Sequence, residues 1–124
     1  MNCAVMQPNY FPWAGYFNLI NKADTFVFLD DAQFSKSNWH NRNSILVKQK
    51  KIWITVPLKK SKLKIGGNFI NSSQINVDKK RTDKIIEILT NLKATNYFSP
   101  LGAEEYLTKD NFKKKTNINL TINN

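Results

Sequence analysis

The chain has few residues of several types, and each scarcity excludes a class of protein. Its 124 residues include one cysteine, Cys3, so no disulfide can form within the chain. They include one histidine, His40, and no cluster with the spacing of a metal site is present. No apolar run approaches the roughly 20 residues that a membrane span needs, and the first residues do not resemble a signal peptide. We therefore expect a cytoplasmic protein with no membrane span, and we assign no metal-ligating residues.

Arginine is also scarce, although the net charge is +10. Arg42 and Arg81 are the only arginines, and the other cations are lysines. Such a charge is compatible with nucleic acid. However, arginine would dominate where phosphates are bound through two hydrogen bonds, and abundant Lys, Asn and Ile are typical of an AT-rich genome. We do not expect nucleic acid as a partner, whereas nucleotide-bearing or phosphorylated small substrates remain compatible with the charge.

The length is enough for one modest domain, which we place at residues 1–124. A hydrophobic fraction of 41%, with 12% aromatics, is sufficient for a core. Residues 3–6 and Thr25–Leu29 are short apolar runs that predict buried strands. Between them, Trp13 to about Lys22 has helical spacing, with Trp13, Phe17 and Ile20 on the face expected to be buried. Strand, helix and strand within this length predict a βαβ unit with parallel strands.

The remaining elements complete an α/β prediction. Ile45–Val47 and Ile52–Val56 indicate an antiparallel hairpin, and Asp78 could cap a helix over about 79–93. Ser99-Pro100 favours a short helix through about Leu107, and residues 118–122 alternate like an edge strand. We predict an open, mainly parallel Rossmann-like sheet with flanking helices and an antiparallel hairpin, which could be incomplete at the C-terminus.

Polar residues follow both strands of the predicted βαβ unit. Gln7 follows the first strand, and Asp30 and Asp31 follow the second. Because parallel strands end at the same edge of a sheet, these groups should converge where α/β proteins bind ligands. One carboxylate could act as a general base or hold a hydrated Mg²⁺. The alternative is that these acids only make hydrogen bonds within a turn.

Two further segments are rich in side chains that suit a binding site. Tyr10 and Tyr16 could stack on a ring, and Trp13 either joins the core or contacts substrate. In residues 38–43, Asn41 and Asn43 are donors and Arg42 could clamp a phosphate or carboxylate. The alternative is a loop whose amides bond to backbone. A lone histidine such as His40 is more often structural than catalytic.

Four stretches resemble the WbqC-like family of bacterial proteins. They are QPNYFPWAGYFNLINKADTFVFLDDAQF (Gln7–Phe34), SNWHNRNSI (Ser37–Ile45), WITVPLK (Trp53–Lys59) and NYFSPLGAEEYL (Asn96–Leu107). The resemblance implies a role in the synthesis of lipopolysaccharide O-antigen or a related glycan. It also implies an activity that transfers glycine or another aminoacyl group to a sugar or nucleotide-sugar intermediate.

The resemblance brings no established catalytic residues, but it directs attention to the residues that match its motifs. We predict Asp30, Asp31 and Arg42 as catalytic residues. We predict as substrate-binding residues Gln7, Tyr10, Trp13, Tyr16, Gln33, Asn41 and Asn43.

Two departures from the family pattern keep other functions open. Family members are commonly longer, so a further half is expected after this segment, and His40 stands where another polar residue, often Gln, is expected. A non-catalytic binding module and an inactive truncated fragment are the alternatives to an enzyme. The sequence identifies neither a cofactor nor a protein partner.

Overall fold

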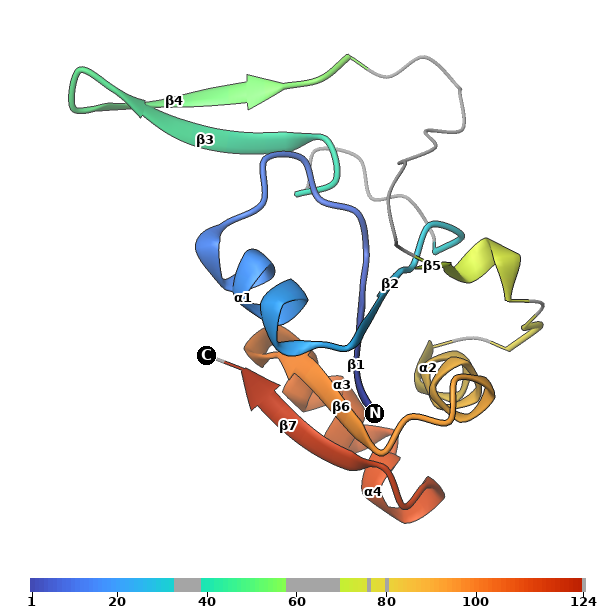
Figure 1. Ribbon diagram of the computed structural model, residues 1–124. Coiled ribbons are helices and arrows are strands. Elements are labelled where there is room, and N and C mark those ends of the chain that lie inside the picture. Colours follow the sequence, from blue (N-terminus) through green and yellow to red (C-terminus); the bar gives the residue numbers. More distant parts are fainter. Residues whose placement is uncertain (33–38, 58–69, 76, 80, 124) are drawn as a thin grey trace.

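The computed structural model describes residues 1–32, 39–57, 70–75, 77–79 and 81–123 (Figure 1). It contains a five-stranded parallel sheet with strand order β5-β2-β1-β6-β7 and a separate two-stranded antiparallel sheet, β3-β4. In chain order the elements are β1 (Asn2–Met6), α1 (Ala14–Lys22), β2 (Thr25–Phe28), β3 (Arg42–Val47), β4 (Lys50–Thr55), β5 (Ile70–Asn71), η1 (Ser72–Gln74), α2 (Arg81–Asn91), β6 (Asn96–Pro100), η2 (Leu101–Ala103), α3 (Glu104–Lys109), α4 (Phe112–Lys115) and β7 (Asn119–Asn123).

The strand order is that of a doubly wound Rossmann-like sheet, which confirms the predicted fold class. β1 lies in the middle and pairs in parallel with β2 on one side and β6 on the other. β5 and β7 extend the sheet in parallel at its two ends. A strand covered on both faces needs apolar residues at successive positions, and β1 supplies them with the buried run from Cys3 to Val5.

Successive residues of β1 face opposite sides of the sheet, and each side has its own core. On one side, Ala4 packs with Tyr16 and Leu19 of α1 and with the aromatic residues of β2. On the other side, Cys3 and Val5 pack with residues of α2, α3 and α4. The helices therefore cover both faces. This strand order requires that arrangement when the crossover connections between parallel strands are right-handed.

The predicted burial along α1 was wrong in detail. Trp13 and Phe17 are 47% and 56% exposed, whereas Tyr16 and Leu19 are buried. The helix begins at Ala14, so Trp13 lies outside it in an extended conformation and does not share its periodicity. The inward stripe instead includes Tyr16, Leu19 and Ile20, which have the helical spacing of three and four residues.

The C-terminal part contains a strand that the sequence pattern did not reveal. Asn96–Pro100 forms β6, and the helical segment expected from Ser99 begins only at Leu101 as η2, followed by α3. Tyr97 and Ser99 are both fully buried, which is the alternation of a strand packed on one face. The edge strand expected at residues 118–122 is confirmed as β7.

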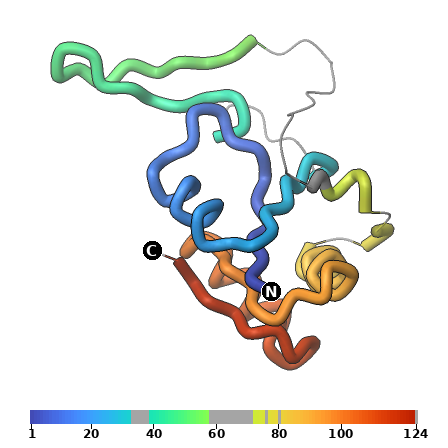
Figure 2. Tube along the Cα trace, in the orientation of Figure 1, coloured from blue at the N-terminus to red at the C-terminus, as the bar shows by residue number. Residues whose placement is uncertain are grey.

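The hairpin prediction is confirmed, and its turn is tighter than expected. Lys48 and Gln49 connect β3 to β4, and their φ angles are 46° and 61°. Two consecutive positive φ values define a type I′ turn, whose twist matches that of the flanking strands. Figure 2 shows the hairpin extending away from the helices and strands of the main sheet.

The buried face of α2, which includes Ile85, Ile88 and Leu89, gives a test of the core. Ile88 is fully buried, so Ile88→Ala should leave a cavity and lower the free energy of unfolding by about 2–5 kcal/mol. Leu46→Ala on the hairpin is the control, because Leu46 is 74% exposed and its truncation should change stability by less than about 0.5 kcal/mol. Urea denaturation measures both. Equal effects would contradict the assignment of the core.

Candidate functional site

A cleft of about 1150 Å³ lies at the edge of the main sheet where the parallel strands end. The chain leaves β1 toward α1 on one face and leaves β6 toward α3 on the opposite face, so the two connections diverge. Doubly wound sheets bind ligands in the crevice that such a divergence creates. The polar and charged side chains that line it are Gln7, Asn9, Asp31, His40, Lys79, Arg81, Lys84, Glu105, Tyr106, Lys109 and Asp110.

Gln7 is held in this cleft through both its backbone and its side chain. Its backbone carbonyl accepts a hydrogen bond from the Tyr16 hydroxyl at 3.1 Å. Its side-chain Oε1 lies 2.6 Å from Nε2 of His40. An amide oxygen can only accept, so Nε2 donates this hydrogen bond, and Nδ1 is the acceptor nitrogen of the neutral ring.

The titration behaviour of these partners is set by burial. Burial raises the pKa of the Tyr16 hydroxyl, so Tyr16 stays protonated and keeps donating to Gln7. Burial lowers the pKa of His40 below its ordinary value, because the charged ring would lose solvation. At neutral pH, His40 is therefore the neutral form that can accept a proton.

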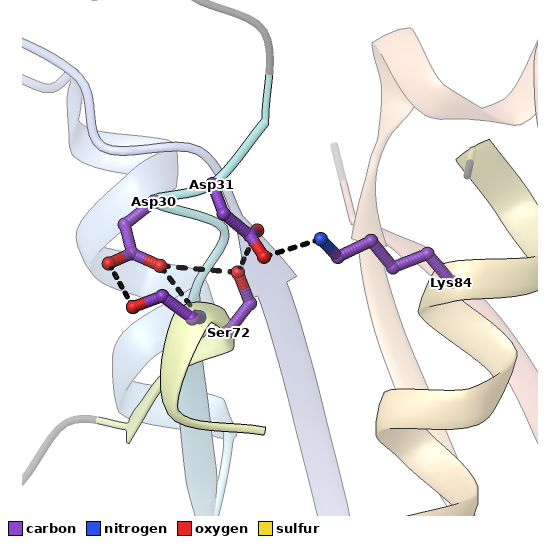
Figure 3. Close-up of polar contacts among 5 residues, drawn as sticks. Asp30, Asp31, Ser72 and Lys84 are labelled. Atoms are coloured by element: carbon purple, nitrogen blue, oxygen red, sulfur yellow. Dashed lines mark hydrogen bonds and ion pairs between the residues drawn. The ribbon is translucent and has the colours of Figure 1, made fainter. Parts of the chain in front are cut away.

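The adjacent acids Asp30 and Asp31 make different contacts (Figure 3). Asp30 accepts hydrogen bonds from the backbone N–H and the hydroxyl of Ser73, at 2.9 and 2.7 Å, and so caps η1. Asp31 pairs with Lys84 of α2 at 2.5 Å. The Ser72 hydroxyl lies within hydrogen-bonding distance of both carboxylates, and only Asp31 lines the cleft.

Asp31 is held in its charged form. Partial burial raises the pKa of this carboxyl, but the hydrogen bonds from Lys84 and Ser72 and the charge of Lys84 outweigh that effect and lower the pKa below its ordinary value. Asp31 and Lys84 therefore form an ion pair that joins the end of β2 to α2 beside the cleft.

The cleft is lined by four cations, Lys79, Arg81, Lys84 and Lys109, and by three acids, Asp31, Glu105 and Asp110. Arg81 and Lys109 make no ion pair or hydrogen bond to other residues within the described ranges. Asp110 accepts a hydrogen bond from Thr82 at 2.7 Å, and Lys79 pairs with Glu87 at 3.2 Å. Arg81 and Lys109 are therefore the cationic groups that can contact a ligand carrying negative charge, in a cleft whose total charge is close to balanced.

Several of the predicted substrate-binding residues connect the hairpin to the rest of the chain. Asn43 Nδ2 donates to the backbone carbonyl of Phe11 at 2.5 Å, and the Tyr10 N–H donates to the carbonyl of Trp39 at 2.8 Å. Buried Asn41 donates to the carbonyl of Val56 at 3.3 Å. The contacts of Asn43 and Tyr10 hold the loop after β1 against the start of β3, and the contact of Asn41 joins the two ends of the hairpin.

The structure brings only part of the predicted site together. Gln7 and Asp31 line the cleft, whereas Tyr16 lies in the core behind Gln7. Arg42 lies on β3, where its guanidinium is 4.3 Å from the centre of the Trp53 ring, and it does not line the cleft. Tyr10, Trp13, Asn41, Asn43 and Asp30 are also not among the lining residues. Gln33 lies outside the described residues.

Sequence reasoning missed the contribution of α2 and gave little weight to His40. Lys84 stands four residues before Ile88, a buried residue of α2, so it lies next to the face that packs on the sheet, and this spacing was a usable signal. His40 is distant from Gln7 in sequence, and no local pattern indicates their contact.

Two negative findings apply to the described part of the chain. It contains no group of three or more His, Cys, Asp or Glu side chains that could hold a metal ion. None of its helices is both long and apolar enough to cross a membrane.

The sheet order defines a doubly wound α/β protein, and its cleft lies at the strand ends, where Rossmann-like sheets bind ligands. The model of the WbqC-like protein family matches residues 7–65 and 60–124, and the chain belongs to this family. "Uncharacterized protein Rv1507c" of Mycobacterium tuberculosis is 51% identical over 55 residues, which cover 44% of this chain and 24% of that protein. The chain thus matches about a quarter of this relative's length. No solved structure matches the chain.

The Asp31–Lys84 pair predicts a pH dependence of stability. Because the folded-state pKa of Asp31 is lowered, its contribution is present above the unfolded pKa of about 3.9 and is lost as the pH falls through the folded value. The stability difference between wild type and Asp31→Asn should therefore narrow below about pH 4. Urea denaturation across this range measures it.

Lys84→Met completes a double-mutant cycle that isolates the pair. The coupling energy between the two positions should be present at neutral pH and vanish at low pH. A coupling energy that does not change with pH would contradict the ion pair.

Proposed function

We propose that this chain forms the substrate-binding part of a transferase that acts on an anionic sugar intermediate, such as a nucleotide sugar, in cell-surface polysaccharide synthesis. The observation that carries the proposal is the cleft at the divergence of β1 and β6, with Gln7 and His40 on one side and the cations of α2 and α3 on the other. Membership in the WbqC-like family supports the polysaccharide context.

The size and charge of the cleft suit this class of ligand. Small-molecule sites commonly enclose about 300–1,000 Å³, so a cleft of about 1150 Å³ has room for a nucleotide and a sugar. Arg81 and Lys109 are available to phosphate oxygens, and the side chains of Gln7 and Asn9 suit sugar hydroxyls.

The residues divide into plausible chemical roles. Neutral His40, oriented by Gln7, is suited to accept a proton from a sugar hydroxyl or amine when an acyl group is transferred to it. Asp31 is a weaker proton acceptor because its pKa is lowered, and it is suited to accept a hydrogen bond from substrate while holding Lys84. The resemblance favours a glycine or other aminoacyl group as the transferred group.

Selective stabilisation by a nucleotide sugar tests the proposal. We expect UDP- or dTDP-sugars to raise the melting temperature, since a ligand at about 100 times its Kd adds about 2.7 kcal/mol to native stability. Gln7→Ala and Lys109→Ala should remove the shift without lowering the melting temperature of the free protein by more than a few degrees. Lys114→Ala on α4 is the matched control, because Lys114 does not line the cleft.

Thermal melts followed by tryptophan fluorescence provide the measurement. A shift that survives both cleft variants would place the ligand elsewhere, and the absence of any shift up to millimolar ligand would overturn the proposal. A shift without group transfer, assayed with the same ligand and an aminoacyl donor, would favour the second candidate, a non-catalytic binding module.

A further inference from the structure

The β3–β4 hairpin exposes large apolar side chains to solvent. Leu46 and Trp53 are 74% and 47% exposed, and Val47 and Ile52 are exposed to a similar degree as Trp53. The hairpin extends away from the main sheet in Figure 1, and both core clusters lie in the main sheet and its helices. A two-stranded hairpin is at best marginally stable alone in water, so a partner strand would stabilise it.

The strand register assigns these side chains to two faces. Directly paired residues share a face of the hairpin. One face carries the pairs Ser44–Trp53 and Leu46–Lys51, and the other face carries the pair Ile45–Ile52. Apolar groups are thus present on both faces. A strand placed beside β4 could contact both faces with its alternating side chains, whereas a flat surface could cover only one.

The outer edge of β4 is where such a strand would pair. β4 pairs with β3 on one side, and within the described residues no strand pairs with its other side. Five of its six residues are exposed, including Ile52 and Trp53. An exposed apolar edge strand presents unpaired backbone N–H and C=O groups to another chain.

Charge identifies the kind of chain that fits. The segment from Arg42 to Pro57 carries Arg42, Lys48, Lys50 and Lys51 and no acidic residue. The cationic groups of Arg42 and Lys51 lie 4.3 and 4.8 Å from the centre of the Trp53 ring, so positive charge borders the exposed aromatic surface. A second copy of a chain with net charge +10 is repelled, whereas an acidic segment is attracted.

We propose that the outer edge of β4 docks an extended, acidic segment of a partner protein, which adds a third strand to the hairpin. The backbone edge provides hydrogen bonds, the apolar residues provide side-chain contacts, and the lysines select acidic residues. Nucleic acid would satisfy the charge but not the open backbone edge. The proposal is independent of the cleft, because none of the hairpin residues from Arg42 to Thr55 lines it.

Fluorescence anisotropy with labelled synthetic peptides tests this directly. The probe is a peptide in which glutamate and isoleucine alternate. Its length of about eight residues lies within the usual range for a strand. One control replaces glutamate with lysine, and another carries a central proline, which cannot donate to a β ladder. We expect binding of the acidic peptide only, weakened by added salt because of screening.

Variants of the protein locate the site. Trp53→Ala and the pair Lys50→Gln with Lys51→Gln should each weaken binding by about tenfold or more. Lys113→Gln with Lys114→Gln on α4 is the matched control for charge and should leave binding unchanged. Hydrogen exchange gives a second readout, in which the peptide should slow exchange of β4 amides while those of α4 stay unchanged.

Three outcomes would overturn the proposal. The first is equal binding of the acidic and basic peptides, or no binding of either. The second is a doubled mass by light scattering that Trp53→Ala reverses, which would make a second copy the occupant. The third is binding of a single-stranded oligonucleotide that depends on Trp53 while the acidic peptide fails to bind. A melting temperature of the hairpin variants within a few degrees of that of the wild type would show that the main fold is intact.

Discussion

The arrangement of the whole molecule depends on the parallel pairing of β1 with strands on both of its sides. β1 is the buried centre of the sheet, and its neighbours β2 and β6 are reached by connections that run over opposite faces. This pairing places the ends of all three strands at one edge. It also forces the chain to diverge there, so a cleft is a geometric consequence of the strand order rather than of any single side chain.

The side chains that line the cleft come from elements that are distant in sequence. Tyr16, whose ring packs in the core under α1, fixes the carbonyl of Gln7, and Gln7 in turn contacts His40 just before the hairpin. On the opposite side, Lys84 of α2 reaches Asp31 after β2. Each contact ties a loop residue of the cleft to a helix, Gln7 to Tyr16 of α1 and Asp31 to Lys84 of α2, which helps to preorganise the cleft.

The sequence predicts the half of the fold whose elements have simple periodicity. The apolar runs of β1 and β2, the helix α2 and the two strands of the hairpin all appear in the structure as expected. β6 was missed because Asn96–Pro100 has only two fully buried side chains and ends in Ser-Pro, which also suits a helix start. Tertiary packing against α3 and α4, including the contact between the Tyr97 and Phe112 rings, stabilises a strand here rather than a helix.

For the candidate site, the convergence of Gln7 and Asp31 follows from parallel strands alone, and the structure places both in the cleft. Consecutive side chains diverge, so one acid was expected to enter the cleft and the other to cap a turn. Which acid does which depends on where Ser72 and Ser73 lie after β5, and the sequence does not show that. Arg42 was predicted from its rarity, but rarity says nothing about direction. Its position on β3 directs it along the hairpin to Trp53.

The positive charges of the cleft and those of the hairpin lie in different surroundings. In the cleft, Lys84 pairs with Asp31 and Lys79 pairs with Glu87, so Arg81 and Lys109 are the cations that a small anion would contact. Along the hairpin no acid opposes the cations, and the charge lies beside exposed apolar side chains and an open backbone edge. A small anion would leave the β4 edge and the exposed apolar side chains in contact with water, whereas a polypeptide strand would cover both. The hairpin and the cleft should therefore select ligands of different size and chemistry.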